Sequence, residues 1–131
     1  SEFNASETDE VHLYQIWILP SKEDVEPSYQ QIAFAPEEKE GQFRLLAAPE
    51  RSGDRPMTII HQDARMYVAD LRPGSTVRYG LGRDRYGWVQ VAKGAVTLNG
   101  HTLSEGDGAA IRDETELSFS GRGEILLFDL P

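Results

Sequence analysis

The apolar residues of this chain recur with a period of two rather than 3.6. Within residues 115–120, Leu117 and Phe119 fall on one face of an extended segment and polar residues fall on the other, as in a half-buried β-strand. Asn99 and Gly100 stand between two alternating segments, and both residue types accept the positive φ that a two-residue hairpin turn requires. We therefore expect a β-hairpin centred on this pair.

Further short apolar or β-branched runs are separated mostly by glycine or proline. They cover residues 57–60, 66–71, 88–92 and 125–130, and residues 74–94 are expected to form a strand, a turn and a second strand. Many short strands with such turns indicate an all-β sandwich or barrel. Residues 36–40 contain helix formers but no apolar face, so we expect at most one helical turn there.

The composition changes near Pro20. Between Leu13 and Leu19 the chain is apolar on both faces, as in a strand that is covered on both sides. Residues 21–28 are mostly polar, with several acidic residues and a proline, which is typical of a linker. We therefore predict an additional strand within residues 1–20, a linker at 21–28, and one main domain at 29–131.

Composition and charge narrow the possible partners. The 131 residues have a mass of 14.7 kDa, which fits a single domain. Acidic residues outnumber basic ones by 22 to 13, and the formal net charge of -9 repels phosphate backbones and anionic lipids. We expect neither nucleic acid nor a membrane as a partner.

Cysteine is absent, which excludes disulfides and thiolate chemistry and is compatible with a cytoplasmic location. Because the chain starts at Ser1, we interpret it as processed or as a piece of a longer protein.

The three histidines stand at no recognised ligand spacing. His101 follows the predicted hairpin turn and is expected to face solvent, and His12 is expected to pack or cap at a strand edge. His61 has Asp63 two residues further on, and a carboxylate in that position can orient an imidazole for proton transfer. A strand would put both side chains on one face, but a turn is equally compatible with the sequence. We favour a structural hydrogen bond for His61.

Glycines and arginines concentrate between residues 78 and 87. Neither a phosphate-binding loop nor a dinucleotide site fits this segment, because no helix follows and no Lys-Ser/Thr pair is present. Arg78, Arg83 and Arg85 are nevertheless candidates for an anion site at the mouth of the fold. The alternative is a solvated loop.

Residues 74–94 resemble the first cupin motif, G-x5-H-x-H-x4-E-x6-G, in length and in glycine frame. In that frame Gly80 and Gly82 occupy the two histidine positions and Gly87 occupies the glutamate position. The second cupin motif places Leu117 at the remaining histidine position. The resemblance implies a cupin β-sandwich of the jelly-roll type. Since glycine and leucine offer no side-chain lone pair, it also implies that this domain holds no metal or other cofactor.

A wider resemblance covers nearly the whole chain. The block His-Leu-Tyr-Gln-Ile-Trp-Ile-Leu-Pro at residues 12–20, the segment 26–31, the strand 88–94 and the ending at 126–131 are similar to pirin-like bicupins, including bacterial quercetin 2,3-dioxygenases. Members of that family have two cupin domains. The N-terminal domain holds a metal through three histidines and a glutamate, and the C-terminal one usually holds none. The resemblance implies that residues 29–131 are the C-terminal cupin and that residues 1–20 are the last strand of the upstream, metal-binding cupin.

The same resemblance suggests a role for Glu2 in a longer parent protein. Glu2 matches the glutamate ligand of the family's His-Ser-Glu run, while the histidine ligands would precede this chain. The parent is expected to bind one divalent transition metal: Fe, Ni, Zn, Cu or Mn. This chain would then be the non-catalytic half of a protein resembling quercetin 2,3-dioxygenase. The alternative is a protein-binding module of a pirin-like transcriptional cofactor or redox regulator.

The expected partner is the upstream cupin of the same polypeptide. Without it, the apolar segment between Leu13 and Leu19, which includes Trp17, would be uncovered, and uncovered strands tend to pair. A homodimer through this segment is the predicted alternative.

Overall fold

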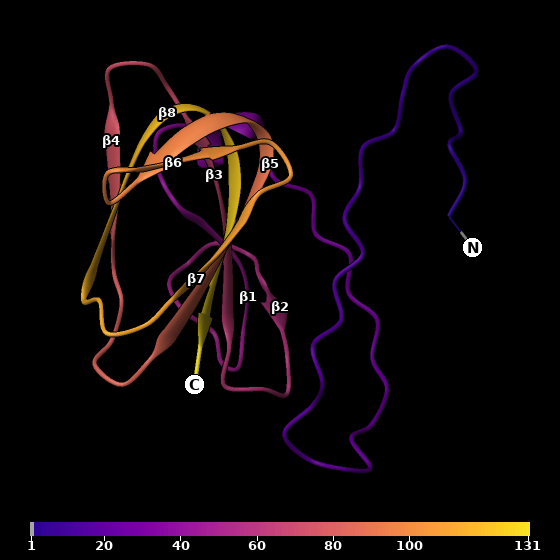
Figure 1. Ribbon diagram of the computed structural model, residues 1–131. Coiled ribbons are helices and arrows are strands. Elements are labelled where there is room, and N and C mark those ends of the chain that lie inside the picture. The colour runs from indigo at the N-terminus through magenta and orange to yellow at the C-terminus, as the bar shows by residue number, and fades with distance from the viewer. Residues whose placement is uncertain (1) are drawn as a thin grey trace.

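The computed structural model describes residues 2–131 and consists mainly of β-strands (Figure 1). The described elements are η1, a 3-10 helix (Pro36–Glu38), β1 (Arg44–Ala48), β2 (Thr58–Ile59), β3 (Arg65–Leu71), β4 (Thr76–Gly80), β5 (Tyr86–Leu98), β6 (His101–Ser104), β7 (Gly108–Ile111) and β8 (Glu116–Leu130). No helix in this part of the chain is long and apolar enough to span a membrane. The all-β prediction is confirmed, and η1 is the single turn expected near residues 36–40.

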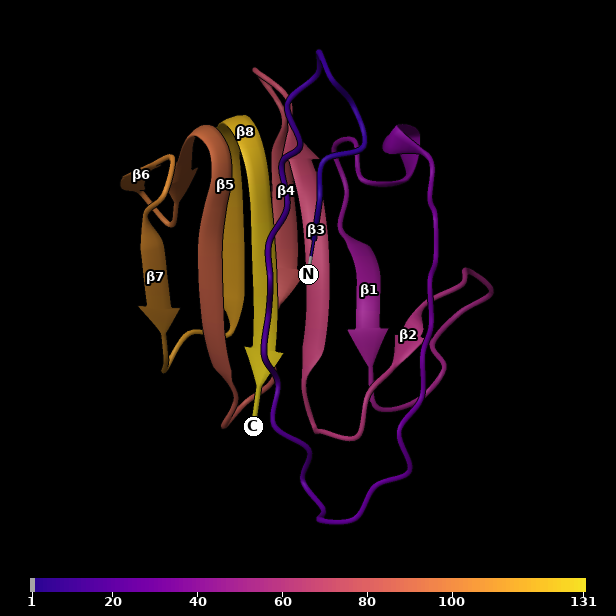
Figure 2. The same ribbon diagram turned by 90° about the vertical axis from the view of Figure 1, so that its right-hand side faces the viewer.

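Two long antiparallel strands, β5 and β8, organise the sheet. The strand order is β2-β1-β3-β8-β5-β6, with β4 added on β8 and β7 added on β5. The first half of β8 pairs with β4 and its second half with β3, while β5 pairs first with β7 and then with β6. Each long strand therefore runs through both layers of a sandwich (Figures 1 and 2). The end strands β2 and β6 do not pair with each other, so the sheet folds over without closing into a barrel.

Glycines allow β5 and β8 to approach closely where both strands bend. Gly94 lies opposite Gly123, next to a register shift between Val91 and Lys93. Gly94 has a φ of 77°, in the left-handed region that favours glycine. A Cβ atom at Gly94 would come closer than 3.0 Å to the carbonyl oxygen of Arg122, and one at Gly123 equally close to that of Lys93. The bend thus requires residues without side chains on both strands.

The hydrophobic core lies between the two layers. The largest fully buried side chains come from the two long strands: Phe119, Leu117, Ile125, Leu127, Val89, Val91 and Val96. The burial of Leu117 and Phe119 confirms the predicted alternation. Phe119 also belongs to a cluster of four aromatic rings, with Phe43, Tyr67 and Tyr79, whose centroids lie 5.0 to 6.0 Å apart in edge-to-face pairs.

The predicted hairpin is confirmed. Leu98 pairs with His101 across a two-residue turn, and φ is 45° at Asn99 and 86° at Gly100. Two positive φ values are the signature of the turn that matches strand twist. The Asn99 side chain adds bonds to the neighbouring strand, because its Nδ2 donates to Glu116 O (3.1 Å) and its Oδ1 accepts from Ser118 N (2.8 Å).

Residues 2–35, which we call the arm, contain no helix or strand. The additional strand predicted between Leu13 and Leu19 is therefore wrong for this chain. The arm passes over the outer face of the sheet near β8 and β3 and returns beside β1 and β2 (Figure 2). A segment that crosses the face of a sheet, rather than following its edge, leaves its backbone out of the hydrogen-bonded ladder.

Side-chain and backbone hydrogen bonds at separate points attach the arm to the sheet. Tyr14 Oη donates to Ala92 O over 3.2 Å, and Gln62 Nε2 donates to Leu19 O over 2.9 Å. Further along, Ile59 N donates to the side-chain oxygen of Gln30 at 3.0 Å. Trp17 and Leu19 nevertheless remain mostly exposed.

Candidate functional site

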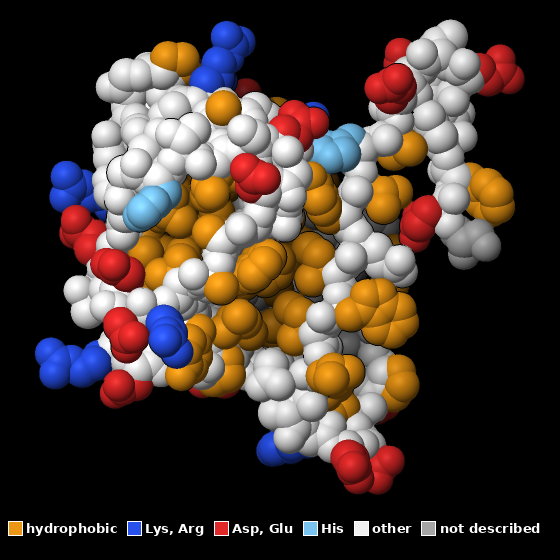
Figure 3. All heavy atoms as spheres, viewed as in Figure 1, with side chains coloured by type: hydrophobic (Ala, Val, Ile, Leu, Met, Phe, Trp, Pro, Cys, Tyr) orange, Lys and Arg blue, Asp and Glu red, His pale blue; other side chains and the backbone are white. Residues whose placement is uncertain are grey.

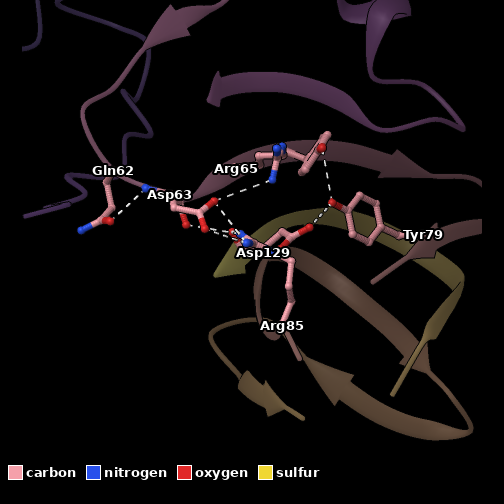
Figure 4. Close-up of polar contacts among 7 residues, drawn as sticks. Gln62, Asp63, Arg65, Tyr79, Arg85 and Asp129 are labelled. Atoms are coloured by element: carbon pink, nitrogen blue, oxygen red, sulfur yellow. Dashed lines mark hydrogen bonds and ion pairs between the residues drawn. The ribbon is translucent and has the colours of Figure 1, made fainter. Parts of the chain in front are cut away.

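A cluster of polar side chains lies at one end of the sandwich interior, next to the aromatic rings. Its centre is the carboxylate of Asp129, near the end of β8, which is only 4% exposed. Tyr79 Oη on β4 donates to Asp129 Oδ2 over 2.6 Å, and it lies 3.3 Å from Tyr67 Oη on β3. Arg85, from the β4–β5 loop, forms an ion pair with Asp129 through its Nε (Figure 4).

Arg85 extends this cluster to the β2–β3 loop. Its Nη1 lies 3.1 and 3.0 Å from the two carboxylate oxygens of Asp63, and its Nη2 donates to the carbonyl oxygens of Asp63 (3.3 Å) and Asp129 (3.2 Å). We call Asp63, Tyr67, Tyr79, Arg85 and Asp129 the Arg85 cluster. One guanidinium thus connects two loops with the end of β8. A planar fork of donors is well suited to such a contact.

The electrostatics of the cluster favour the protonated forms of Arg85 and Tyr79. Burial by itself would lower the pKa of Arg85, but hydrogen bonds and charge attraction from Asp129 and Asp63 raise it overall. Burial, together with the hydrogen bonds to Asp129 and Tyr67, raises the pKa of the Tyr79 hydroxyl. Tyr79 therefore remains a protonated donor at neutral pH. The arrangement provides a satisfied polar network rather than an activated base or nucleophile.

The four positions of the cupin metal frame have different surroundings: Gly80 and Gly82 are exposed, whereas Gly87 and Leu117 are buried. Gly80 faces open space, and a Cβ at Gly82 would contact only the Arg85 side chain. A Cβ at Gly87 would meet the side chain of Ile111 at 3.3 Å. Leu117 is fully buried. Over residues 2–131 there is no group of three or more His, Cys, Asp or Glu placed to hold an ion. Because no imidazole or carboxylate stands at these positions, their chemistry does not fit a metal.

Glu2 lies in the exposed arm, outside the sandwich. A single carboxylate supplies one of the several ligands that a transition metal needs. Glu2 alone therefore does not constitute a metal site in this chain.

The three arginines proposed as an anion site have different environments. Arg78 pairs with Glu116 at 3.0 Å, and both side chains are exposed. Arg85 is turned toward Asp63 and Asp129, and Arg83 is exposed in the β4–β5 loop. Carboxylates already neutralise two of the three guanidinium groups. The anion site stays a prediction, and an anion would have to compete with these ion pairs.

His61 and Asp63 do not act together in the structure. The carboxylate of Asp63 faces Arg85, as described above, and His61 lies in a bend rather than in a strand. The carbonyl oxygen of His61 accepts hydrogen bonds from Ser21 N at 2.7 Å and Ser21 Oγ at 3.2 Å. His61 thus has a structural role, as favoured from the sequence, but the contact is made by its backbone.

The other two histidines lie apart from the Arg85 cluster. His101 is exposed on β6, which confirms its expected place beside the hairpin turn. His12 lies in the arm, where its ring packs edge-on against Tyr14 with centroids 5.0 Å apart. His12 therefore packs as expected, although no strand forms around it.

Comparison with known proteins assigns the chain to a family. Residues 45–130 match the family described as the quercetinase C-terminal cupin domain. The chain belongs to this C-terminal cupin family. It is 38% identical to a quercetin 2,3-dioxygenase of Escherichia coli over 100% of its own length and 55% of that protein. It is also 35% identical to a pirin-like protein of Caulobacter vibrioides, over 98% of this chain and 56% of that one. This C-terminal cupin therefore spans a little more than half the length of these relatives.

Solved structures confirm the cupin fold. The protein YhhW of Escherichia coli superposes with a TM-score of 0.78 at 35% identity, over 88% of this chain and 48% of that one. A second structure of YhhW, described as a bacterial pirin in complex with nickel(II), gives a TM-score of 0.77 at 36% identity, with the same coverage. The cupin assignment from the glycine frame and the pirin-like resemblance are both confirmed.

The sequence patterns did not reveal three members of the Arg85 cluster in this C-terminal cupin. Tyr67 and Tyr79 fall within short strands where aromatic residues usually pack in a core. Asp129 continues the inward-facing series of Ile125 and Leu127 on β8. A carboxylate on the inner face of a strand was the one signal in the sequence that pointed to a buried polar partner.

The raised pKa of Tyr79 predicts a measurable pH dependence. The folded state holds this proton more tightly than the unfolded state, whose tyrosines titrate near pH ~10. The resulting stabilisation is therefore complete below that pH and declines as the pH rises above it. In an absorbance titration of the folded protein, the Tyr79 hydroxyl should therefore give no ionisation signal as the pH rises past ~10.

Tyr79→Phe should leave the folded-state amplitude unchanged, because Tyr79 does not ionise until the protein unfolds. A lower folded-state amplitude in Tyr79→Phe than in the unmodified protein would show that the Tyr79 hydroxyl ionises while the protein is folded.

Proposed function

We propose that this chain is the non-catalytic C-terminal half of a two-cupin protein whose whole acts as a metal-dependent quercetin 2,3-dioxygenase. Two relatives support the proposal, one named quercetin 2,3-dioxygenase and one named putative quercetin 2,3-dioxygenase, and the matched region covers 55% of each. In this interpretation residues 29–131 form the C-terminal cupin, residues 21–28 link it to the preceding segment, and residues 1–20 belong structurally to the upstream cupin.

The observation that carries the proposal is the chemistry of the four metal positions. Gly80, Gly82, Gly87 and Leu117 provide no donor atoms, and a Cβ at Gly87 would meet the side chains of Ile111 and Leu81. Divalent transition metals in proteins are held by imidazole, carboxylate or thiolate groups. The chemical step must then take place in the other half of the protein.

A metal in that other half would take Glu2 as one of its ligands. Together with three upstream histidines, this carboxylate would complete a set suited to one Fe, Ni, Zn, Cu or Mn ion. The bound ion would supply a site for activating the flavonol toward dioxygen. The contribution of this chain to the reaction would be one ligand and the support of the upstream domain.

Exposed apolar side chains of the arm provide a surface for that support. Phe3, Trp17 and Leu19 are 87%, 84% and 78% exposed. Beneath the arm, a groove of about 790 Å³ separates it from Trp88 and Phe128 on the sheet. Large apolar side chains left in water mark an interface. We infer that the upstream cupin covers these side chains.

Substitutions in the whole two-cupin protein test this proposal. Glu2→Gln should reduce both the bound metal, measured by elemental mass spectrometry, and the oxygen consumed with quercetin by at least tenfold. Glu7→Gln, in the same exposed loop, is the matched control and should behave as the unmodified protein. Gly80→Ala should also leave turnover unchanged, because the added methyl group enters open space.

Equal metal content in Glu2→Gln and Glu7→Gln would remove Glu2 from the ligand set. A Gly80→Ala variant that folds, keeps its metal and loses turnover would show that this half takes part in the chemistry.

The exposed arm also favours one alternative function, a protein-binding module of a pirin-like cofactor or redox regulator. In that case Trp17 would be accessible in the whole protein and would bind a second protein, or a second copy of the chain. Quenching of tryptophan fluorescence by acrylamide separates the two functions. Protection of Trp17 in the whole protein supports the upstream domain as its partner, and free access supports the binding module.

A further inference from the structure

Residues 61–63, which follow β2, connect the arm to the sandwich. Gln62 Nε2 donates to Leu19 O over 2.9 Å, and the backbone N of Ser21 donates to His61 O over 2.7 Å. The hydroxyl of Ser21 adds a second hydrogen bond to the same oxygen, at 3.2 Å. All of these bonds fall within a short stretch at the end of the apolar part of the arm. We call residues 61–63 the latch.

The arm is stiff where the latch holds it. Leu19 and Ser21 are the two neighbours of Pro20. The proline ring fixes its own φ at about −65° and restricts the preceding residue to extended conformations. The spacing between the carbonyl of Leu19 and the amide of Ser21 therefore varies little, which suits hydrogen bonds to two successive residues of the latch. Fixing a stiff segment costs less conformational entropy than fixing a flexible one.

The conformation of the latch is held from inside the sandwich. Gln62 Oε1 accepts from Asp63 N at 2.9 Å, which orients the amide so that its Nε2 faces the arm. Gln62 O accepts from the backbone N of Ala64, a buried residue, at 2.8 Å. On the inner side, the carboxylate of Asp63 pairs with Arg85 at 3.0 Å (Figure 4). The Arg85 cluster therefore reaches the arm through the latch.

The latch lies beside the exposed apolar side chains of the arm. Gln62 lines the groove that separates Trp17 and Leu19 from Trp88 on the sheet. Figure 3 shows hydrophobic side chains both on the arm and on the neighbouring part of the sandwich. Because residues 2–35 form no strand, no hydrogen-bonded ladder holds the arm at this surface. Its course there depends on the latch.

We propose that the latch fixes the arm in the position in which its apolar side chains meet the upstream cupin, and that Asp63 and Arg85 are positioning residues for this contact. The inference rests on the function proposed above, in which the upstream cupin covers Trp17 and Leu19. Two linked domains move relative to each other unless their contact is extensive and apolar. By holding the segment directly before the linker at 21–28, the latch removes motion that would otherwise be lost on docking.

Amide hydrogen exchange at Ser21 in the folded protein tests the latch. Asp63→Ala should raise the exchange rate of this amide about tenfold, whereas the amides of β5 and β8 should exchange as in the unmodified protein. The matched control is Glu116→Ala, since Glu116 is a similarly exposed carboxylate that also lies 3.0 Å from an arginine. It should leave exchange at Ser21 unchanged.

A second pair of variants tests the contact with the arm itself. Gln62→Glu replaces the donor that faces Leu19 O with a carboxylate oxygen and should also raise exchange at Ser21 about tenfold. Its matched control is Gln42→Glu, because Gln42 Nε2 likewise donates to a backbone carbonyl, that of Glu37, at 3.2 Å. Gln42→Glu should leave exchange at Ser21 unchanged.

The same variants test the contact with the upstream cupin. In the whole two-cupin protein with Trp88→Phe, Asp63→Ala should increase acrylamide quenching of Trp17 about twofold, because the released arm opens locally. Free access to Trp17 without any latch substitution would contradict the function proposed above. Exchange at Ser21 does not depend on that result, so the latch and the proposed function fail separately.

Three results would overturn the inference. One is an exchange rate at Ser21 that neither Asp63→Ala nor Gln62→Glu raises. Another is an equal rise at Ser21 and throughout β5 and β8, because Asp63 would then stabilise the whole domain rather than position the arm. The third is a protected Trp17 in the whole protein whose quenching Asp63→Ala leaves unchanged, because the contact with the upstream cupin would then not need the latch.

Discussion

A Gly123→Ala variant is expected to lose more than about 4 kcal/mol of the free energy of unfolding, which exceeds the effect of most single substitutions. The reason is steric. A Cβ atom at Gly123 would lie closer than 3.0 Å to the carbonyl oxygen of Lys93 on the paired strand. Backbone cannot rotate aside as a flexible side chain can, so β5 and β8 would have to separate at their bend. Because β5 and β8 contribute most of the core side chains, the substitution should destabilise the whole domain.

Gly80→Ala is the matched control for this prediction. Gly80 lies on β4 with nothing within 4 Å of an added Cβ, so the effect on stability should stay within about 0.5 kcal/mol, as for other surface changes. The free energy of unfolding of both variants can be measured by thermal and urea denaturation followed by circular dichroism. Similar stabilities for Gly123→Ala and Gly80→Ala would show that the bend tolerates a side chain and that the close approach of the strands is not essential.

An Arg85→Met variant is expected to lose about 3–5 kcal/mol of the free energy of unfolding, the cost of leaving a buried charge without its partner. Asp129 is 4% exposed, and Arg85 supplies its only cationic neighbour among the described ion pairs. The contact with Asp63 contributes less, because the carboxylate of Asp63 is mostly solvated. Urea denaturation gives the free energy, and an unchanged m-value would show that the unfolding transition is the same.

Arg78→Met provides the comparison for Arg85→Met. Arg78 pairs with Glu116 at 3.0 Å, but both side chains are exposed, so its removal should cost no more than about 1 kcal/mol. The double variant Arg85→Met with Asp129→Leu should recover much of the loss, since it no longer buries an unpaired charge. If Arg85→Met lowers the free energy of unfolding no more than Arg78→Met does, the Arg85 cluster does not hold the end of the sandwich together.

The sequence was sufficient to predict those features that depend on local pattern. Alternation placed Leu117 and Phe119 in the core, and Asn99 with Gly100 located the hairpin, because a turn of this type depends on its own two residues. These inferences needed no knowledge of which strand lies beside which.

Features that depend on distant partners could not be predicted in this way. β1 begins with Arg44, a residue that rarely lies in a core, and its burial depends on an ion pair with Glu38 and on the carbonyl oxygens of Leu45 and Pro56. β7 has the sequence Gly-Ala-Ala-Ile, with little side-chain bulk to indicate a strand, and it forms because β5 lies beside it.

The arm and the Arg85 cluster also depend on distant partners, which the sequence pattern does not identify. The residues between Leu13 and Leu19 have the composition of a covered strand, but composition does not say which neighbour covers it. Arg85 and Asp129 are far apart in the sequence, and only the folded sheet brings them together.

The most direct test of the account is the metal content of this chain itself. Residues 1–131 would be incubated with excess Ni(II) or Fe(II), passed through a desalting column, and assayed by elemental mass spectrometry. Because the positions of Gly80, Gly82, Gly87 and Leu117 offer no ligands, we expect far less than one ion per chain, whereas the whole two-cupin protein should retain one. Retention of one tightly bound ion by this chain would contradict the account.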